Sequence, residues 1–462
     1  MIARAIVTRF LRRIEGGSLT VVEPGRTHVF GPSDEALRVT VTLQDSGVWR
    51  ALLRGSTGLG ESYMDGRWNA DDLTALVRLG ARNARKLDRW RARFALVLRP
   101  VQRLRGGRAN SVRRSRRQIS RHYDIGNDLF AAMLDERMVY SSAIFATPGA
   151  SLEEAQLAKL DAICTKLELR PDDHLLEIGT GWGALAIHAA AHYGCRVTTT
   201  TISREQHAEA TARVRAAGLQ DRVTVLLRDY RELTDRYDKL VAIEMIEAVG
   251  WRNFDRFFAR VSDLLEPDGL ALLQAILIDD RAYDVEKAGR SFITTFIFPG
   301  GALPSMEVMA RSVRRHTDLQ WLDVEDLTAD YVLTLRHWRD RFLRARAALE
   351  AAGYQRRFQR LWELYLRYCE AGFMERRITD VQALFAKPGY RVNMRPLIAS
   401  STNAGPRDAS FASVSGGVAR AEQDLGDRLA HQALRDSAPD AAVGAGHQNR
   451  RVVQLHDEEY FH

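Results

Sequence analysis

Residues 174–183 read HLLEIGTGWG, an apolar run that passes directly into a glycine-rich segment. The run suits a buried strand, while the glycines allow a tight turn and close approach of a ligand to the backbone. Residues 184–190 read ALAIHAA, which is typical of a helix. The order of strand, glycine turn and helix indicates the start of a nucleotide-type βαβ unit.

The spacing of the glycines, together with the glutamate before them, indicates which class of ligand the turn binds. A dinucleotide-binding turn places its third glycine three residues after the second, whereas Gly183 follows Gly181 by two. Glu177, at the end of the predicted strand, can accept hydrogen bonds from an ammonium group or a ribose. The block is similar to the first motif of S-adenosylmethionine-dependent methyltransferases, although glycine turns of this kind also occur without a ligand.

Composition bounds the class of protein. The 462 residues exceed the usual size of one domain, and 45% apolar with 27% charged residues is typical of a soluble globular protein. The net charge of +8 fits nucleic acid or an anionic membrane as a partner. Three widely separated cysteines lack metal-ligand spacing, so we expect reduced thiols in a cytosolic protein and no metal site. No apolar run is long enough to span a bilayer, and arginines interrupt any signal-like segment at the N-terminus.

Residues 1–85 are predicted to form a small α+β domain. Residues 2–14 place Ile2, Ile6, Phe10 and Ile14 at helical spacing with arginines between them. This pattern fits either an interfacial membrane helix or a helix packed on its own domain. Alternating apolar and polar residues between positions 18 and 54 then predict strands.

Two segments are predicted to lack a core. Residues 86–118 are a basic linker, because arginines are frequent there with almost no acidic partner, which favours contact with phosphate. Few aromatic residues are interleaved for base stacking, so lipid phosphate is preferred to nucleic acid, with a merely solvated segment as the alternative. Residues 403–462 are rich in small and charged residues and are predicted to be a disordered tail.

Residues 119–402 are predicted to form a larger α/β domain. Strands expected at 175–178, 195–202, 223–227, 240–245 and 270–278 alternate with helices, with a turn at residues 267–269. This order implies a parallel sheet that binds ligands at the carboxyl ends of its strands. Residues 279–305 interrupt the alternation with an apolar insertion, which is either a lid or channel for an apolar substrate or an ordinary helix packed on the sheet.

Six blocks, taken in order, resemble the cyclopropane-fatty-acyl-phospholipid synthase family, which is related to the mycolic acid cyclopropane synthases. They are residues 122–130 (HYDIGNDLF), 138–143 (MVYSSA), 176–183 (LEIGTGWG), 244–250 (EMIEAVG), 297–305 (IFPGGALPS) and 368–373 (YCEAGF). The resemblance extends from about residue 58 to about residue 392, and the ordered set is highly specific. It implies a Rossmann-like methyltransferase domain over residues 119–402 and a smaller N-terminal lipid-binding domain.

The resemblance also implies a binding site for S-adenosylmethionine. The positions that match the family's cofactor contacts are Tyr140, Ser141, Glu177, Gly179, Thr180, Gly181, Trp182, Gly183, Thr201, Ser203, Gln206, Asp229, Tyr230 and Ile243. Asp229 and Tyr230 would flank the adenine, and Ile243 would lie beside the sulfonium. Ser203 with Gln206 also fits a capping box at the start of a helix.

The family reaction is an attack of an acyl-chain double bond on the methyl group of S-adenosylmethionine. The resulting carbocation must be kept from water and must lose a proton to a placed base, which in the family is a bound bicarbonate ion. The residues that the resemblance places around this anion are Glu247, Tyr331, Gln274, Ser142 and Ile276. Glu247 would accept the O–H of bicarbonate while Tyr331 and backbone N–H groups donate to its oxygens. Without the resemblance, Glu247 would be interpreted as a helix-start carboxylate and Tyr331 as a core phenol.

Three positions depart from the family pattern. Ser142 replaces a cysteine, Gln274 stands where many members have a histidine, and Ala248 replaces the histidine after the glutamate. The Gln274 amide still donates hydrogen bonds but does not titrate. These changes are compatible with methyl transfer and leave the product open between a cyclopropane ring and a methyl or methylene branch.

We therefore predict an S-adenosylmethionine-dependent methyltransferase that converts unsaturated phospholipid acyl chains into cyclopropane fatty acids. We expect it in the cytoplasm, peripheral at the inner face of the membrane, with a homodimer left open. The alternatives are a branched acyl product from the same substrate and a membrane-binding protein with a degenerate methyltransferase domain. A nucleic-acid methyltransferase is disfavoured, because the chain lacks an Asn-Pro-Pro-Tyr type motif for an extruded base.

Overall fold

The computed structural model describes residues 2–32, 36–84, 86, 126–287 and 289–391. The predicted tail at 403–462 and all but one residue of the predicted linker at 86–118 lie outside these ranges, as do residues 122–125 of the first family block. Within the described ranges, no helix is long and apolar enough to cross a membrane.

The N-terminal part contains a four-stranded sheet in the order β2-β1-β3-β4, in which β1 pairs with β2 antiparallel and with β3 parallel. Its elements are α1 (Ile2–Leu11), β1 (Ser18–Glu23), β2 (Arg26–Phe30), β3 (Arg38–Leu43), α2 (Val48–Ala51), η1 (Leu52–Arg54), α3 (Gly55–Met64), β4 (Trp68–Ala70) and a helix over residues 73–84. Alternate strand residues, such as Leu19 and Val21 of β1 and Val39 and Val41 of β3, are buried, as a sheet with one covered face requires. The α+β architecture predicted for this part is confirmed.

Helix α1 uses a different face from the one that the sequence suggested. Val7 and Leu11 pack against the core, while Ile2, Ile6 and Phe10 remain 79%, 43% and 44% exposed. The prediction of a helix packed on its own domain is confirmed, whereas the interfacial membrane helix stays a prediction.

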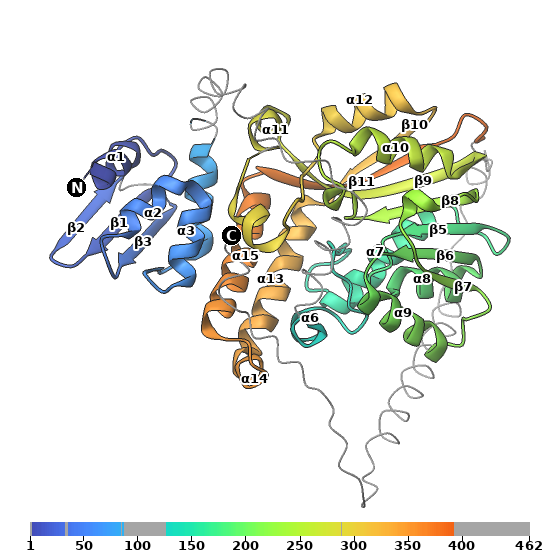
Figure 1. Ribbon diagram of the computed structural model, residues 1–462, viewed down its shortest axis with the longest axis horizontal. Helices are drawn as coiled ribbons and strands as arrows, with labels where there is room; N and C mark the ends of the chain where they lie inside the picture. Colours follow the sequence, from blue (N-terminus) through green and yellow to red (C-terminus); the bar gives the residue numbers. More distant parts are fainter. Residues whose placement is uncertain (1, 33–35, 85, 87–125, 288, 392–462) are drawn as a thin grey trace, which may run out of the picture. The chain divides into compact units, whose positions relative to one another are not determined.

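The larger part is built on a seven-stranded sheet in the order β10-β11-β9-β8-β5-β6-β7 (Figure 1). Its helices are α6 (Asn127–Met133), α7 (Leu152–Lys166), α8 (Ala184–His188), η2 (Ala189–Tyr193), α9 (Arg204–Ala216), η3 (Tyr230–Glu232), η4 (Ile246–Ala248), α10 (Phe254–Asp263), α11 (Asp280–Glu286), η5 (Ile293–Ile297), α12 (Met306–His316), α13 (Thr328–Arg344), α14 (Arg346–Ala351) and α15 (Arg356–Met374). Its strands are β5 (His174–Ile178), β6 (Arg196–Thr201), β7 (Val223–Leu227), β8 (Tyr237–Ile243), β9 (Leu265–Ile278), β10 (Gln320–Asp326) and β11 (Ile378–Ala386).

The sheet separates two helical layers. Leu175 of β5 packs in a cluster with side chains of α7 and α8, whereas its neighbour Leu176 packs with side chains of α10 and α12. This alternation follows from the period of two along a strand, and Figure 1 shows these helices on opposite faces of the sheet. A strand buried on both faces explains why residues 174–178 read as a nearly continuous apolar run.

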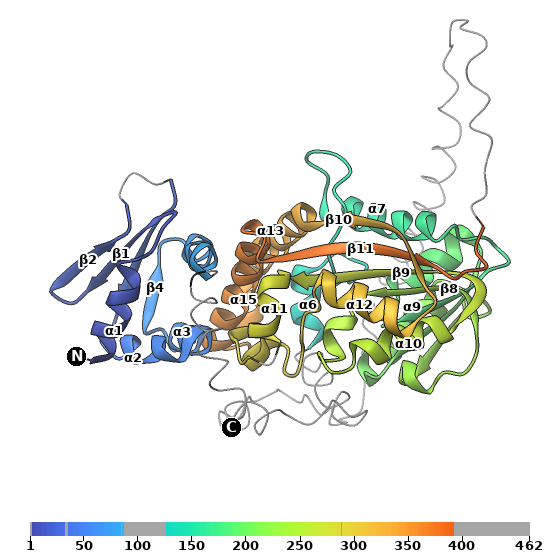
Figure 2. The ribbon, with the colours of Figure 1, turned by 90° about the horizontal axis from the view of Figure 1, so that it is seen from above.

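The five predicted strands are confirmed as the parallel core of the sheet, β7-β6-β5-β8-β9. Two further strands were not predicted: β11 lies antiparallel between β9 and the edge strand β10, as the long ribbons in Figure 2 show. Strand β10 is largely exposed and lacks an apolar alternation, so its sequence gave no strand signal. The expected turn at 267–269 lies inside β9 instead, as an interruption of the ladder between the pairs Tyr237–Leu265 and Lys239–Leu270.

Candidate functional site

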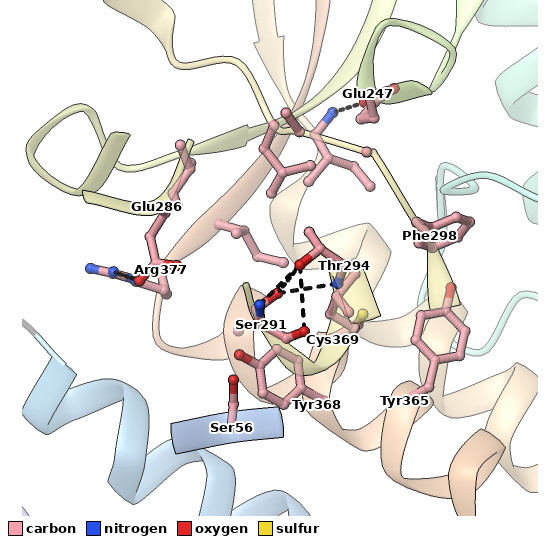
Figure 3. A pocket seen from close by; sticks show the side chains of 18 of the residues that line it. Ser56, Glu247, Glu286, Ser291, Thr294, Phe298, Tyr365, Tyr368, Cys369 and Arg377 are labelled. Atoms are coloured by element: carbon pink, nitrogen blue, oxygen red, sulfur yellow. Dashed lines mark hydrogen bonds and ion pairs between the residues drawn. The ribbon is translucent and has the colours of Figure 1, made fainter. Parts of the chain in front are cut away.

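A cavity lies where the parallel strands end, at the edge that the predicted topology assigns to ligands. Its wall includes the glycine turn after β5, residues 200–202 at the end of β6, and residues 228–231 after β7. At and just after the end of β8 it includes Ile243, Glu244, Met245, Glu247, Ala248 and Val249. Apolar side chains extend the wall through Ile276 of β9 and Phe298 of the predicted insertion, with Tyr365 of α15 close by in Figure 3. The insertion therefore lines the cavity and does more than cover the sheet.

The glycine turn has the conformation that its sequence predicted. Gly179, Gly181 and Gly183 have φ values of +104°, +51° and +89°, a region that side chains disfavour. A Cβ atom at Gly179 would lie 3.3 Å from Cγ of Met245, on the cavity wall. Thr180 and Trp182 line the cavity beside these glycines, and Trp182 donates to Oδ1 of Asn127 at 3.2 Å.

Glu177 is buried at the end of β5 and lines the cavity. Its Oε2 accepts a hydrogen bond from the Thr199 hydroxyl at 2.6 Å. Burial raises the pKa of Glu177 to about 8, so the carboxyl is mostly neutral at pH 7 without a ligand. An ammonium group beside it would favour the ionised form, which suits the role that the sequence suggested.

The segment after β6 is a small hydrogen-bonded unit. The Ser203 hydroxyl caps α9 by accepting from the backbone N–H of Gln206, as predicted. The other half of the predicted capping box is wrong, because the Gln206 side chain accepts from the Thr201 hydroxyl at 2.8 Å. Thr201 and Gln206 line the cavity, whereas Ser203 shapes the segment from behind.

Asp229 and Tyr230 follow β7 and line the cavity, as does Ile243 at the end of β8 on the other side of β5 and β6. Asp229 is buried, caps η3 and accepts from the Arg231 guanidinium at 2.6 Å. Tyr230 lies edge-on to Phe257, with 5.6 Å between ring centroids, so its position is fixed from the core side.

Tyr140 and Ser141 approach the same cavity from the segment after α6. The Tyr140 and Tyr365 hydroxyl oxygens are 2.8 Å apart, and the Ser141 hydroxyl accepts from Nζ of Lys159 at 2.7 Å. Lys159 is almost completely buried, and burial lowers its pKa to about 8 against the opposing charge of Glu244. The buried Lys159 thus interacts electrostatically with both Glu244 and Glu177.

The centre of the predicted catalytic group is a residue that the sequence analysis did not select, Glu244. Its Oε1 accepts from the Ser142 backbone N–H at 2.7 Å and from the Gln274 amide at 3.0 Å. Its Oε2 accepts from the Tyr331 hydroxyl at 2.6 Å. Burial raises the pKa of Glu244, while these three donors oppose the shift by stabilising the charged form.

Glu247 lies three residues further along, and within the described residues its carboxyl has no hydrogen bond to Tyr331. Its Oε1 accepts from the Ile276 backbone N–H at 2.6 Å (Figure 3), and its buried Oε2 has no hydrogen-bond partner among the described residues. Burial, followed by the charge of Glu244, raises the pKa of Glu247 to about 8. Glu247 is therefore mostly the neutral acid at pH 7.

Behind Glu244 the polar network continues through Gln274, which is buried. Its amide donates to Oδ2 of Asp380 at 2.9 Å, and its Oε1 accepts from the Gln382 amide at 3.1 Å. Burial and the charges of Glu244 and Glu247 raise the pKa of Asp380 well above its usual range. Asp380 is thus a neutral acid that supports the network from the strand β11.

Comparison with known proteins matches this arrangement to a family. A family model described as mycolic acid cyclopropane synthetase matches residues 110–383, which is more than half of the chain and includes the whole cavity wall of the larger part. The chain belongs to this family.

Characterised relatives cover most of the chain. Tuberculostearic acid methyltransferase UfaA1 of Mycobacterium tuberculosis is 38% identical over 381 residues, which cover 80% of this chain and 88% of the relative. Cyclopropane-fatty-acyl-phospholipid synthase of Escherichia coli is 39% identical over 345 residues, which cover 73% of this chain and 85% of the relative.

Solved structures agree with the fold. The cyclopropane synthase MmaA2 from Mycobacterium tuberculosis has a TM-score of 0.55 and 30% identity, with 59% of this chain and 98% of that chain covered. Mycolic acid cyclopropane synthase CmaA1, solved in complex with SAH and CTAB, has a TM-score of 0.55, 29% identity and the same coverage. The predicted Rossmann-like methyltransferase domain is confirmed, and this chain is an S-adenosylmethionine-dependent methyltransferase.

The anion that the resemblance placed among the catalytic residues does not fit this member of the family. The Ser142 N–H, the Gln274 amide and the Tyr331 hydroxyl, which were expected to donate to bicarbonate, all donate to Glu244. The Ile276 N–H donates to Glu247. The predicted donors therefore converge as expected, but the chain's own carboxylates occupy them.

The sequence analysis did not select three charged residues of this polar network: Glu244, Lys159 and Asp380. Each places a charge in a mostly buried stretch: Glu244 directly after β8, Lys159 on the buried face of α7, and Asp380 within β11. A buried charge needs a partner, so such an interruption is a signal. The partners, however, come from distant segments, and the sequence alone did not connect them.

Proposed function

We propose that the protein transfers the methyl group of S-adenosylmethionine to the double bond of unsaturated phospholipid acyl chains and closes the product to a cyclopropane ring. The observation that carries this proposal is the continuity of one cavity, from the glycine turn after β5 to the apolar wall of Ile276, Ile278 and Phe298. A flexible apolar chain can thus lie beside the cofactor. The E. coli relative of that name supports the substrate class.

Different residues of the cavity wall have different roles in this reaction. The turn around Gly179 leaves room for the cofactor, whose sulfonium supplies an electrophilic methyl group. Glu177 accepts the ammonium group of the bound cofactor. The apolar wall excludes water, which would otherwise capture a carbocation. The carboxylates after β8 lie at the end of this wall, where a proton must be removed.

A second product is supported by a specific observation. The relative UfaA1 is a tuberculostearic acid methyltransferase, and Gln274 here stands where many members of the family have a histidine. A branched chain would form if the proton left a neighbouring chain carbon in place of the transferred methyl group. The same cavity serves either outcome.

The test is product formation on vesicles of a monounsaturated phospholipid with isotope-labelled S-adenosylmethionine. We expect one labelled carbon per modified acyl chain by mass spectrometry, and ring protons by nuclear magnetic resonance. Olefinic or methyl-branch signals would support the second product. An unmodified lipid, with S-adenosylmethionine bound, would contradict both.

We further propose that the enzyme works in the cytoplasm, peripheral at the inner face of the membrane. The exposed apolar face of α1, with Ile2, Ile6 and Phe10, is flanked in sequence by Arg9, Arg12 and Arg13. Apolar insertion together with attraction to anionic lipid is the physics of an interfacial helix. The arginines between residues 99 and 121 add charge of the same sign.

Vesicle sedimentation tests this proposal. Binding should require anionic lipid and weaken with salt, because exposed charges are screened. Replacing Arg113, Arg114, Arg116 and Arg117 by glutamine should weaken binding by about 1 kcal/mol for each arginine that lies near the surface, and leave S-adenosylmethionine affinity unchanged. Binding that is equal on neutral and anionic vesicles would rule out the electrostatic part.

A further inference from the structure

Three of the donors that the family resemblance assigns to bicarbonate form hydrogen bonds to the carboxylate of Glu244 instead. We propose that the carboxylate of Glu244 is the base that takes the proton from the acyl cation, in the place where the family resemblance implied bicarbonate. The proposal rests on the proposed function, because it concerns the cation formed by methyl transfer to the acyl chain.

Geometry is the first support. The N–H of Ser142, the amide of Gln274 and the hydroxyl of Tyr331 converge on the two oxygens of Glu244 at 2.7, 3.0 and 2.6 Å. Oε1 accepts two of these bonds and Oε2 accepts one. A carboxylate oxygen has two lone pairs, so within the described residues one lone pair of Oε2 remains for a proton.

Position is the second support. Glu244 lines the cavity directly after Ile243, at the carboxyl end of β8 and beside the wall that continues through Met245. Its φ of +48° is in the left-handed region, which costs a residue with a side chain about 1 kcal/mol or more. Such strain is concentrated at functional sites, where surrounding contacts hold it in place.

The distribution of charge is the third support. Within the described residues, both carboxylate oxygens of Glu244 accept hydrogen bonds, whereas Oε2 of Glu247 has no partner and its Oε1 accepts from Ile276. Hydrogen bonds to the charged form favour ionisation, and the ammonium of Lys159 acts in the same direction on Glu244. Among the three acids Glu244 is therefore the one whose contacts most favour the ionised form, and an ionised carboxylate facing the cavity can act as the base.

The step balances without any further reactant. Methyl transfer to one carbon of the double bond leaves the positive charge on the other carbon. A C–H bond of the transferred methyl group then breaks; its electron pair closes the ring onto the cationic carbon, and its proton goes to Oε2 of Glu244. For a branched product the C–H bond of a neighbouring chain carbon breaks and its electron pair forms a double bond. In either case Glu244 returns its proton to solvent before the next turnover.

The first experiment compares the wild-type enzyme in buffer stripped of carbon dioxide with the same buffer after bicarbonate is added. We expect equal rates of product formation on monounsaturated phospholipid vesicles. A wild-type enzyme that loses its activity in stripped buffer and regains it with bicarbonate would overturn this inference alone. A wild-type enzyme that forms no methylated lipid in either buffer would overturn the proposed function, and this inference with it.

The second experiment removes the base. Glu244→Gln keeps the shape and the acceptor oxygen but not the charge, so we expect turnover to fall by about 100-fold or more in both buffers, with S-adenosylmethionine affinity retained. Glu244→Gly suits the left-handed backbone and frees the three donors; we expect it to be slow in stripped buffer and to be rescued by bicarbonate. Glu307→Gln, an exposed carboxylate of α12, is the matched control. Full activity of both Glu244 variants in stripped buffer would overturn the assignment.

Discussion

The glycine turn after β5 and the carboxylate network around Glu244 are neighbouring walls of one cavity, but they are built in opposite ways. The turn occupies residues 179–183, and its three left-handed glycines determine its shape locally. The network takes single residues from segments more than 200 positions apart, from Ser142 to Asp380. A local conformational preference specifies the first region, and only the packing of the whole domain assembles the second.

Substitutions in the two regions should also have different effects on cofactor binding and turnover. The turn excludes side chains by contact and backbone strain, so a change there is close to all-or-none for cofactor binding. The network acts through hydrogen bonds and charge, whose effects are graded and visible in pH dependence. Four substitutions test this contrast.

The largest effect is expected from Gly179→Val. A branched side chain is strained at φ +104° and its Cβ would contact Met245, so S-adenosylmethionine affinity should fall by about 100-fold, from roughly 3 kcal/mol of strain and overlap. Isothermal titration checks it. Gly218→Val is the control, because Gly218 has φ +69° but a Cβ there meets nothing within 4 Å. Equal loss of affinity in both variants would show that the effect is global strain.

Tyr331→Phe should act on the rate and leave cofactor affinity nearly unchanged. It removes one donor to Glu244 while the stacking on Phe373 at 4.4 Å is retained. A hydrogen bond to a charged group is worth about 2 kcal/mol, so turnover should fall by roughly tenfold or more. Losing this donor raises the pKa of Glu244, and the acidic limb of the rate profile should therefore move to higher pH. A slower enzyme with an unshifted profile would contradict the link to Glu244.

Glu247→Gln should change how stability depends on pH. The pKa of Glu247 is about 8 in the folded protein and 4.5 is its ordinary value, so between these values the folded state binds more protons than the unfolded state. Stability therefore falls as pH rises through this window, by up to about 1.4 kcal/mol per pH unit for one such group. Urea unfolding across the window should show a flatter decline in the variant. The variant should still lose some stability as the pH rises, because the pKa of Glu177 is also about 8.

Thr199→Val is expected to have the smallest effect. It removes the hydroxyl that donates to Glu177 at 2.6 Å without changing the buried volume much. Because that bond favours the charged carboxylate, its loss should weaken S-adenosylmethionine binding by about threefold, from somewhat less than 1 kcal/mol. The turnover of bound cofactor should be unaltered. A variant with normal affinity and slow turnover would show that Glu177 acts in catalysis. It would contradict the assignment of cofactor binding to one region and catalysis to the other.

The parts of the site that the sequence predicted well are those with contiguous residues. At the ends of β5, β6, β7 and β8, at least one predicted cofactor residue lines the cavity. These residues could be predicted because each lies at the end of a strand that the apolar pattern of the sequence indicates. The predicted catalytic donors are also brought together. In the structure three of them share Glu244 as their partner, and its presence among them depends on how β8, β9 and α13 pack.

By itself, the sequence determined the parallel core of the sheet, the glycine turn and the family, since each rests on patterns of neighbouring residues. Only the tertiary structure decided which carboxylate the donors serve, that β10 and β11 extend the sheet, and which face of α1 is exposed. The physical reason is that burial and hydrogen bonding between distant segments set the protonation of Glu244, Glu247 and Asp380. Those quantities belong to the folded chain and have no local equivalent in the sequence.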